Sequence, residues 1–543
     1  MEREELVGEV LARLARGEAP LAERECAALW EDRGDPVAAA LASVAAFWRG
    51  DFAGAARWAG ASTGGASDDT SAALGLAATA LAAAGDADAD GEPSWSAAMA
   101  RVRTTGDPSS PWWSAVRYLL AEAALVSARL TDAARALESG PPTGDAWRGH
   151  PYEPVLRACD VRVAAFSGDI SAATALLDPL RASVTRGERS EWVVEAVAAL
   201  VLGNADDPEG VRRSIELSSA LEGAAEHDFV DRGVMFLLAF GAIAVGDVAT
   251  AARLVLRAGG DGDLSLSTVI DRALGLELLV VAALAEDDLA AAEAWLGSLE
   301  GLAHDRAAGP VALRARARHL IAVGDVDAAI DDLCSSVAAC RADGRGVEAA
   351  EGEIVLARAR ILAQDVASAS RDLRNLVSAS DATGHHAVRR SAASTLQPAR
   401  RRLPPVAGGG WAVLSERERE VALLVLDGRE IEEIAALLFV SPATVRAHVS
   451  RVLCAFGVPT RIGLLAAARP ERPASGSVAP PLSPRQRDVA RLVASGQGNQ
   501  QIAGTLGISV KGVEKHVGDV LVRWGVRSRF EIARLWCDTE GSS

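Results

Sequence analysis

Apolar residues recur at helical spacing along most of the chain, in segments separated by short polar turns. The stretch ARHLIAV directly before Gly324 and the stretch AAIDDLCSSVAA shortly after it are examples. Their apolar positions fall three and four residues apart, which predicts one buried face on each of two helices. Period-2 alternation and runs of β-branched residues, which indicate strands, are scarce, and alanine and leucine abound. The chain is therefore predicted to be all-α.

A short signature, Gly-Asp-apolar-x-x-Ala, divides the first 400 residues into pairs of helices. Clear copies begin at Gly50, Gly168, Gly246 and Gly324. Weaker copies stand at Leu130, Asp287–Leu289 and Gln364–Val366, and one copy has decayed near Asn204–Asp207. In each clear copy we expect the glycine to end one helix and the aspartate to cap the next. The closing alanine would let the two helices pack closely.

This signature resembles the turn of the tetratricopeptide-type helical hairpin. The resemblance implies an α-solenoid of nine or ten hairpins over residues 1–403. Stacked hairpins bury a shared core and expose a concave surface. Such a surface is expected to bind a protein, a peptide or a small-molecule effector, and the alternative is a spacer or oligomerisation rod.

The segment Leu414–Arg461 has a second, similar copy at Leu482–Arg529, and the two align without a gap. In the first copy, Ser415 and Glu418 form a predicted capping box, and Gly428 ends that helix. Ser441 is a predicted N-cap of a third helix, and a fourth helix starts near Thr460. Each copy is thus predicted to be a small four-helix unit.

Two short helices joined by a tight turn follow the logic of the helix-turn-helix, whose second helix enters the major groove. Both copies also carry L-S-x-R-x-R-x-V, I-A-x-x-L, S-x-x-x-V-x-x-H-V and G-V-x-x-R. These motifs resemble the LuxR/GerE-type DNA-binding domain. The resemblance implies that the third helix reads DNA and that the fourth often forms the dimer contact. We predict domains at residues 411–469 and 482–538, joined by a linker over 470–481.

The predicted reading helices differ between the copies. The first presents small residues flanked by Arg446 and Arg451, and the second presents Lys511 and Lys515, the two lysines of the chain. Arginine and lysine can contact phosphates or guanine edges. The predicted DNA-binding residues are Thr444, Arg446, Ala447, Ser450, Arg451, Arg461, Asn499, Ser509, Lys511, Glu514, Lys515 and Arg529. An alternative is that one or both copies serve mainly for dimerisation.

The two copies could act together on one DNA site. Half-sites of related dimers lie about 34 Å apart. The linker between the copies, at about 3.1 Å per residue in an extended Pro-rich form, spans roughly 37 Å. Apolar residues on the fourth helices could pair the copies: Leu464, Leu465, Ile532 and Leu535.

Charge differs between the first 410 residues and the rest of the chain, which favours DNA binding by the C-terminal part. Residues 411–543 carry 17 basic and 14 acidic side chains, whereas residues 1–410 carry 39 and 59. An acidic body would avoid DNA and a mildly basic tail would approach it. Six scattered cysteines suit a reducing compartment, and the longest apolar run, Val234–Val245, is only 12 residues. We therefore expect a cytoplasmic protein with no membrane partner.

The sequence does not point to an enzyme. A P-loop needs a lysine, and none precedes Lys511. No residues stand at metal-ligand spacing beside His448 or His516, so no metal, cofactor or enzyme activity is expected. The sequence thus predicts a DNA-binding transcriptional regulator, with RNA polymerase and a second copy of the chain as candidate further partners. The alternative is an interaction scaffold or anti-regulator whose helix-turn-helix units mainly dimerise.

Overall fold

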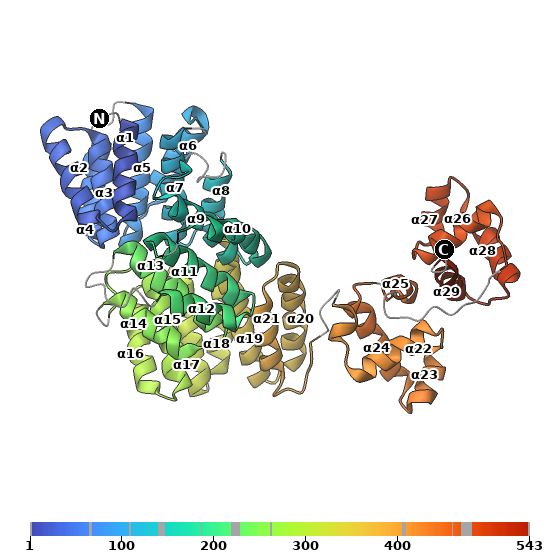
Figure 1. The fold of residues 1–543 in the computed structure, drawn as a ribbon. Helices are drawn as coiled ribbons and strands as arrows, with labels where there is room; N and C mark the ends of the chain where they lie inside the picture. Colours follow the sequence, from blue (N-terminus) through green and yellow to red (C-terminus); the bar gives the residue numbers. More distant parts are fainter. Residues whose placement is uncertain are drawn as a thin grey trace. The chain divides into compact units, whose positions relative to one another are not determined.

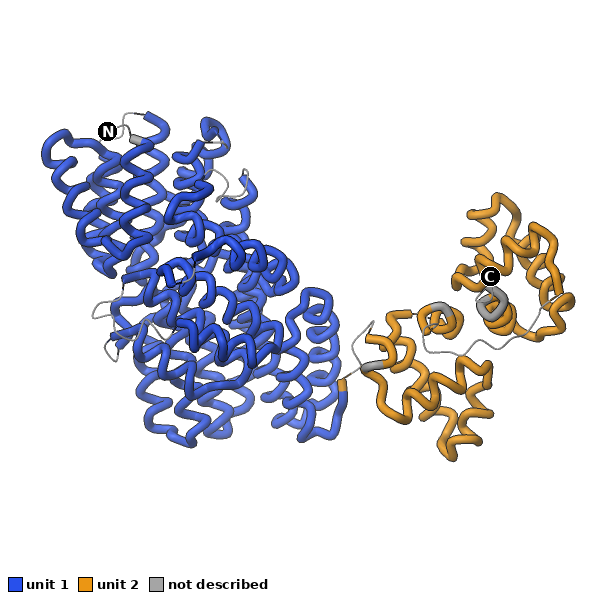
Figure 2. Tube along the Cα trace, viewed as in Figure 1, with its two compact units in different colours: residues 1–402 blue, residues 403–543 orange. Residues whose placement is uncertain are grey.

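The computed structural model describes residues 3–64, 68–107, 110–139, 147–185, 187–218, 228–260, 263–403, 409–458, 460–468 and 480–540. Every regular element in these ranges is a helix, which confirms the all-α prediction. The chain divides into two compact units, residues 1–402 (the body) and residues 403–543 (the C-terminal unit) (Figures 1 and 2). Residues 404–408, which join the body to the C-terminal unit, and most of the predicted linker at 470–481 lie outside the described residues.

The body is built from consecutive helices that pack as antiparallel neighbours. Their bounds are α1 (Arg3–Ala15), α2 (Ala19–Arg33), α3 (Pro36–Arg49), α4 (Phe52–Gly64), α5 (Asp69–Ala82), η1 (Ala83–Gly85), α6 (Glu92–Thr105), α7 (Pro111–Val126), α8 (Leu130–Glu138), α9 (Glu153–Phe166) and α10 (Ile170–Ser183). There follow α11 (Arg189–Asn204), α12 (Pro208–Leu217), α13 (Phe229–Ala244), α14 (Val248–Gly259), α15 (Val269–Ala285), α16 (Leu289–Glu300), α17 (Gly309–Val323), α18 (Val326–Ala342), α19 (Gly346–Leu362), α20 (Val366–Ala382) and α21 (His386–Leu396).

The Gly-Asp signatures form the turns inside the hairpins. Gly168, Gly246 and Gly324 have φ angles of 87°, 90° and 92°, which glycine adopts without a steric cost. The next residue caps the second helix: Asp169, for example, accepts a hydrogen bond from the Ala172 N–H at 2.9 Å. The closing alanines are completely buried, at 0% exposure: Ala55, Ala173, Ala251 and Ala329. The expected roles of all three residue types are confirmed.

The same turn geometry persists where the signature is weak. Four non-glycine residues take the glycine's place with positive φ: Ala128 (56°), Asp206 (65°), Asp287 (57°) and Gln364 (65°). Near Asn204–Asp207, where the signature has decayed, Asp207 still accepts from the Gly210 N–H at 2.9 Å. Helices α11 and α12 therefore form a hairpin that the Gly-Asp signature does not predict.

The chain of hairpins winds back onto itself. The N–H of Leu130 donates to the carbonyl of Asp343 at 3.1 Å, and the N–H of Ser171 donates to that of Thr383 at 2.8 Å. Both bonds join the start of a helix early in the body to a turn late in it. A Cβ on Gly346 would lie 2.0 Å from the carbonyl oxygen of Ser167. Backbone therefore meets backbone along this seam, and hairpins that are distant in sequence contact one another.

The C-terminal unit contains the two sequence copies as two four-helix units. The first has η4 (Gly410–Val413), α22 (Glu416–Leu426), α23 (Ile431–Leu438), α24 (Pro442–Ala455) and α25 (Arg461–Ala467). The second has α26 (Pro484–Ala494), α27 (Asn499–Leu506), α28 (Val510–Trp524) and α29 (Arg529–Glu540). Equivalent residues form the two cores at 0% exposure: Val421, Val425, Ile434, Val445 and Val452 match Val489, Val493, Ile502, Val513 and Val520.

None of the helices in the described ranges combines the length and the apolar character that a bilayer crossing needs.

Candidate nucleic-acid interface

The helix-turn-helix of each copy is built by side-chain caps that the sequence predicts. The Ser415 hydroxyl accepts from the Glu418 N–H at 3.3 Å, and the Glu418 carboxylate accepts from the Ser415 N–H at 3.1 Å. This is the expected capping box. Ser441 accepts from the Thr444 N–H and Ser509 from the Gly512 N–H, both at 3.1 Å. The caps fix where the two candidate reading helices, α24 and α28, begin.

In each copy, one arginine of the shared motif donates a hydrogen bond to the turn in front of the reading helix. Arg417 donates to the carbonyl of Leu438 at 2.5 Å, and Arg485 donates to that of Leu506 at 2.7 Å. These carbonyls end α23 and α27. Sequence reasoning gave the motif arginines no such role, although their presence at one position in both copies was a signal.

The reading helix of the first copy exposes a face of small residues. Val445, Val449 and Val452 are buried, whereas the predicted contact residues Thr444, Ala447 and Ser450 are exposed. A helix with small exposed side chains can approach the floor of a groove closely. The predicted apolar and small faces of α24 are thus on opposite sides.

Each predicted arginine of the first copy meets a carboxylate. Arg446 lies 3.4 Å from Glu432, with both side chains mostly exposed. Arg451 lies 2.5 Å from Glu418, and Arg461 lies 3.3 Å from Glu430 while donating to the carbonyl of Arg429 at 2.6 Å. DNA phosphates would compete with these carboxylates for the same guanidinium groups.

The Arg451 pair alters the titration of its neighbours. Burial opposes ionisation of Glu418, but hydrogen bonds from Ser415 and Arg451 keep the pKa of that carboxyl below its usual value. Partial burial and the adjacent Arg451 lower the pKa of His448. The ring nitrogen Nδ1 of His448 lies 2.6 Å from Arg451. His448 is thus an uncharged partner of Arg451, and the described residues contain no group of His, Cys, Asp or Glu arranged to hold a metal.

The reading helix of the second copy leaves its cations free. Val513 and Val520 are buried, whereas Ser509, Lys511, Glu514 and Lys515 are exposed. Among the described residues no carboxylate forms an ion pair with Lys511 or Lys515. Their positive charges are therefore available to an external anion.

Two predicted residues of the second copy bond to each other. Arg529 donates to the Asn499 side-chain oxygen at 2.5 Å and also to the carbonyl of Gln497. Burial lowers the pKa of this guanidinium. Arg461 makes the equivalent bond to Arg429 in the first copy. Both arginines thus tie the start of the fourth helix to the turn before the second helix.

The two copies contact each other through their fourth helices. Helices α25 and α29 pack together. The guanidinium of Arg534 donates to the carbonyl of Asp427 at 2.6 Å, and that of Arg461 lies 5.9 Å from the ring centre of Phe530. The buried residues on these helices include Leu464, Leu465, Ile532 and Trp536.

The same two segments match a protein-family model, that of the LuxR family of bacterial regulatory proteins, at residues 412–468 and 480–536. Both segments are LuxR-type regulatory domains. Residues of this chain are 43% identical over 56 positions to the HTH-type transcriptional regulator Rv0890c of Mycobacterium tuberculosis, which is 10% of this chain and 6% of that protein. They are 44% identical over 73 positions to the transcriptional regulatory protein NarL of the same species, which is 13% of this chain and 32% of NarL. The chain thus spans less than a third of the NarL length and far less of the first protein.

A comparison with solved structures matched this chain to the crystal structure of the APC/C hetero-tetramer Cut9–Hcn1. The match covers 73% of this chain and 93% of that chain, at 10% identity and a TM-score of 0.29. A similarity this low supports no inference about what the body binds.

Proposed function

We propose that this protein is a sequence-specific DNA-binding transcriptional regulator whose body binds a protein, peptide or small-molecule signal. The proposal rests on Lys511 and Lys515 on helix α28 of a LuxR-type domain, which are exposed and form no ion pair with any described residue. Exposed positive charges that no carboxylate neutralises attract the phosphates of DNA. Helix α28 is then the principal reading helix.

The first copy has a supporting role in this proposal. Its arginines at positions 446, 451 and 461 are already paired with carboxylates. Binding DNA through them requires the carboxylates to be displaced, which reduces the net gain. The small face of Thr444, Ala447 and Ser450 remains free to enter a groove. We expect weaker, shape-dependent contacts here than from α28.

The contact between α25 and α29 supports action by both copies of one chain on one site. Because the two reading helices differ in sequence, the preferred site should have two unlike halves. The second domain then binds at an effective concentration set by its attachment to the first.

The test is binding of the full chain to duplexes selected from a random pool. The double variant Lys511→Ala/Lys515→Ala should weaken binding to all sequences and reduce the slope of affinity against salt by about 2. The matched control is Arg487→Ala/Arg491→Ala, which removes two exposed charges with the same spacing from α26. Equal losses in both variants would show that only net charge matters and would overturn the assignment of α28.

One alternative is supported by the paired arginines of the first copy. A scaffold or anti-regulator would use α25 and α29 for association and would not select a sequence. Failure of the full chain to enrich any sequence from the random pool would favour this alternative.

A further inference from the structure

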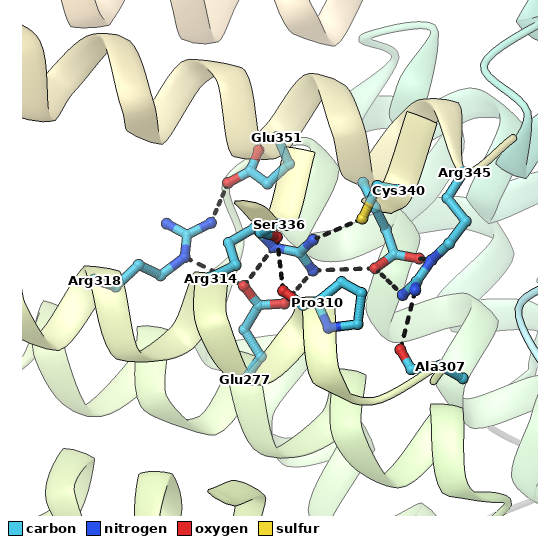
Figure 3. A network of polar contacts seen from close by, with 10 residues as sticks. Glu277, Ala307, Pro310, Arg314, Arg318, Ser336, Cys340, Arg345 and Glu351 are labelled. Carbon is cyan, nitrogen blue, oxygen red and sulfur yellow. Dashed lines mark hydrogen bonds and ion pairs between the residues drawn. The ribbon is translucent and has the colours of Figure 1, made fainter. Parts of the chain in front are cut away.

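Helices α15, α17 and α19 bury a network of charged side chains inside the body (Figure 3). Arg314, only 2% exposed, donates to both oxygens of Glu277 at 2.7 and 2.5 Å and to Glu348 at 3.2 Å. Arg345 donates to both oxygens of Glu348 at 2.7 and 2.6 Å. Burying ion pairs is costly, and apolar residues of similar volume often stabilise a core better. Packing alone does not explain the network.

Arg318 extends the network toward a cavity. Its guanidinium lies 3.4 Å from Glu277 and forms an ion pair with Glu351. The cavity beside it has a volume of about 300 Å³, at the small end of the range for ligand sites. Its wall combines the polar residues Arg318, Glu351, His385 and Arg390 with apolar ones such as Phe240, Leu278 and Ile354. A molecule with one polar end and an apolar remainder matches this lining.

The hydrogen bonds that the cavity wall already makes indicate which charge the polar end of the ligand carries. Both oxygens of Glu277 and both of Glu348 already accept bonds from arginine, as does one oxygen of Glu351. Donors remain unused. The Nη1 groups of Arg318 and Arg390 have no partner among the described residues, since their bonds are made by Nε and Nη2.

His385 adds a further unused donor. Its side chain lines the cavity and the residue is 5% exposed, yet its ring makes no hydrogen bond within the described part of the chain. Burial lowers its pKa to about 4, so the ring is neutral near pH 7. A neutral imidazole still carries one N–H that can donate to an acceptor.

We propose that this cavity binds a small monocarboxylic acid with an apolar body. Its carboxylate accepts hydrogen bonds from Arg318 and His385, and its apolar part lies against Phe240, Leu278 and Ile354. A carboxylate offers only acceptors, which is what the unused donors need, and charge-assisted bonds to arginine are the stronger kind. An ammonium group offers these donors no acceptor, and an alcohol offers a single uncharged oxygen, to which arginine donates weaker bonds than to a carboxylate.

The site lies where the last helix of the body meets helices from its middle. Asn204 at the end of α11 and residues of α21 line the same cavity, and Arg390 bonds to Asp206 at 2.7 Å. An occupant would therefore stabilise the position of α21, the last helix of the body. This inference rests on the proposed function in one respect, namely that the body binds a signal.

The test uses the full chain with three octyl probes, octanoate, octylammonium and 1-octanol, and with phenylpropionate as a second acid. Binding is measured by titration calorimetry and by the rise in unfolding temperature. We expect the two acids to bind and the amine and alcohol to bind at least tenfold more weakly. Arg318→Gln should weaken acid binding about tenfold or more.

The matched control is Arg316→Gln on the same helix. Arg316 also forms a two-bond pair, to Asp332 at 2.7 and 2.6 Å, but it is half exposed and does not line the cavity. This variant should bind octanoate like the parent. His385→Gln keeps a donor in the cavity and should retain more of the binding than His385→Leu does.

The outcomes separate the site from the wider proposal. Absence of binding by either acid, tighter binding of the amine, or equal losses in the Arg318 and Arg316 variants would overturn the site. DNA affinity is measured on the same samples with and without octanoate. Acid binding that leaves DNA affinity unchanged would uphold the site and contradict signal transmission. A full chain that binds the acids but selects no DNA sequence would contradict the proposed function and leave the site standing.

Discussion

Phe439 and Gly507 occupy the same place in the two copies, the turn before the reading helix. Both have left-handed backbone, with φ of 54° for Phe439 and 63° for Gly507. Phe439 is 95% exposed, so its ring gains almost nothing from burial to offset the strain, which is about 1–2 kcal/mol for a non-glycine residue. The first copy therefore carries a local cost that the second avoids.

Substitutions at these two positions should have opposite effects on the free energy of unfolding. Gly507→Ala should reduce it by about 1 kcal/mol, and Phe439→Gly should raise it by up to about 1 kcal/mol, because left-handed backbone favours glycine. Gly518→Ala is the control, since Gly518 lies inside α28 with open space around it. That change should stabilise the helix by about 0.5–1 kcal/mol. Urea unfolding of the full chain measures all three.

The buried ring of His385 should make the body sensitive to acid. Its pKa is lowered to about 4 by burial, whereas an unfolded histidine titrates near 6.5. Between these values the unfolded chain binds more protons, so the stability that His385 contributes is complete above about pH 6.5 and is lost as the pH falls toward 4.

Between pH 7 and pH 5 the parent should lose about 2 kcal/mol more than a His385→Gln variant. His304, which is exposed beside Asp88, supplies the control His304→Gln. Identical pH profiles for the parent and the His385 variant would show that the ring is not buried in a neutral form.

Residue roles differ in how far the sequence could predict them. Caps such as Ser415 and Ser441 depend on neighbours three residues away, so local pattern sufficed. The partners of the predicted DNA contacts are distant in sequence: Arg451 reaches Glu418, and Arg529 reaches Asn499. No spacing rule indicates such pairs. Whether these arginines also touch DNA stays a prediction.

At the scale of helices, the hairpin turns could be predicted and the seam could not. A Gly-Asp pair specifies a turn and a cap by itself, which is why the helices that follow Gly168, Gly246 and Gly324 begin where expected. Gly346, in contrast, gave no signal as a residue of the seam. Glycine is needed at this position because the carbonyl of Ser167 leaves no room for a side chain, and only the folded chain brings that carbonyl near.

Gly346→Ala should therefore destabilise the body strongly. The new methyl carbon would lie 2.0 Å from the Ser167 oxygen, and backbone must move because no flexible side chain can yield. We expect a loss of at least about 2 kcal/mol, in the range known for overpacked cores. Gly297→Ala in α16, where an added Cβ would meet nothing within 4 Å beyond the backbone of its own helix, should be neutral or stabilising. Thermal unfolding of the two variants side by side is the measurement.

For the C-terminal unit as a whole, the contact between the copies should set how DNA is bound. Arg534→Gln removes a hydrogen bond between the copies, and Phe530→Ala removes the ring that faces Arg461. Neither variant replaces a predicted DNA-binding residue. We expect their combination to weaken binding to a duplex with both half-sites by about tenfold, because the domains then become independently oriented. Binding to a single half-site should be unchanged.

A gel-shift titration with both duplexes measures this, and Arg491→Gln on α26 is the charge control. An equal loss on the single half-site would mean that the variants damage the second domain itself. A complex that contains two chains per duplex would replace the intramolecular pair with a dimer of whole chains.

The seam of the body has a consequence for how the protein folds and unfolds. Open repeat arrays lose their terminal hairpins first, since each unit touches only its neighbours. Here Leu130 is bonded to the turn at Asp343, and Ser171 to the turn at Thr383, so hairpins distant in sequence hold one another. The body should unfold in one sharp transition rather than fray from its ends. It should also fold slowly for a helical protein, because contacts of long sequence separation must form before the seam is stable.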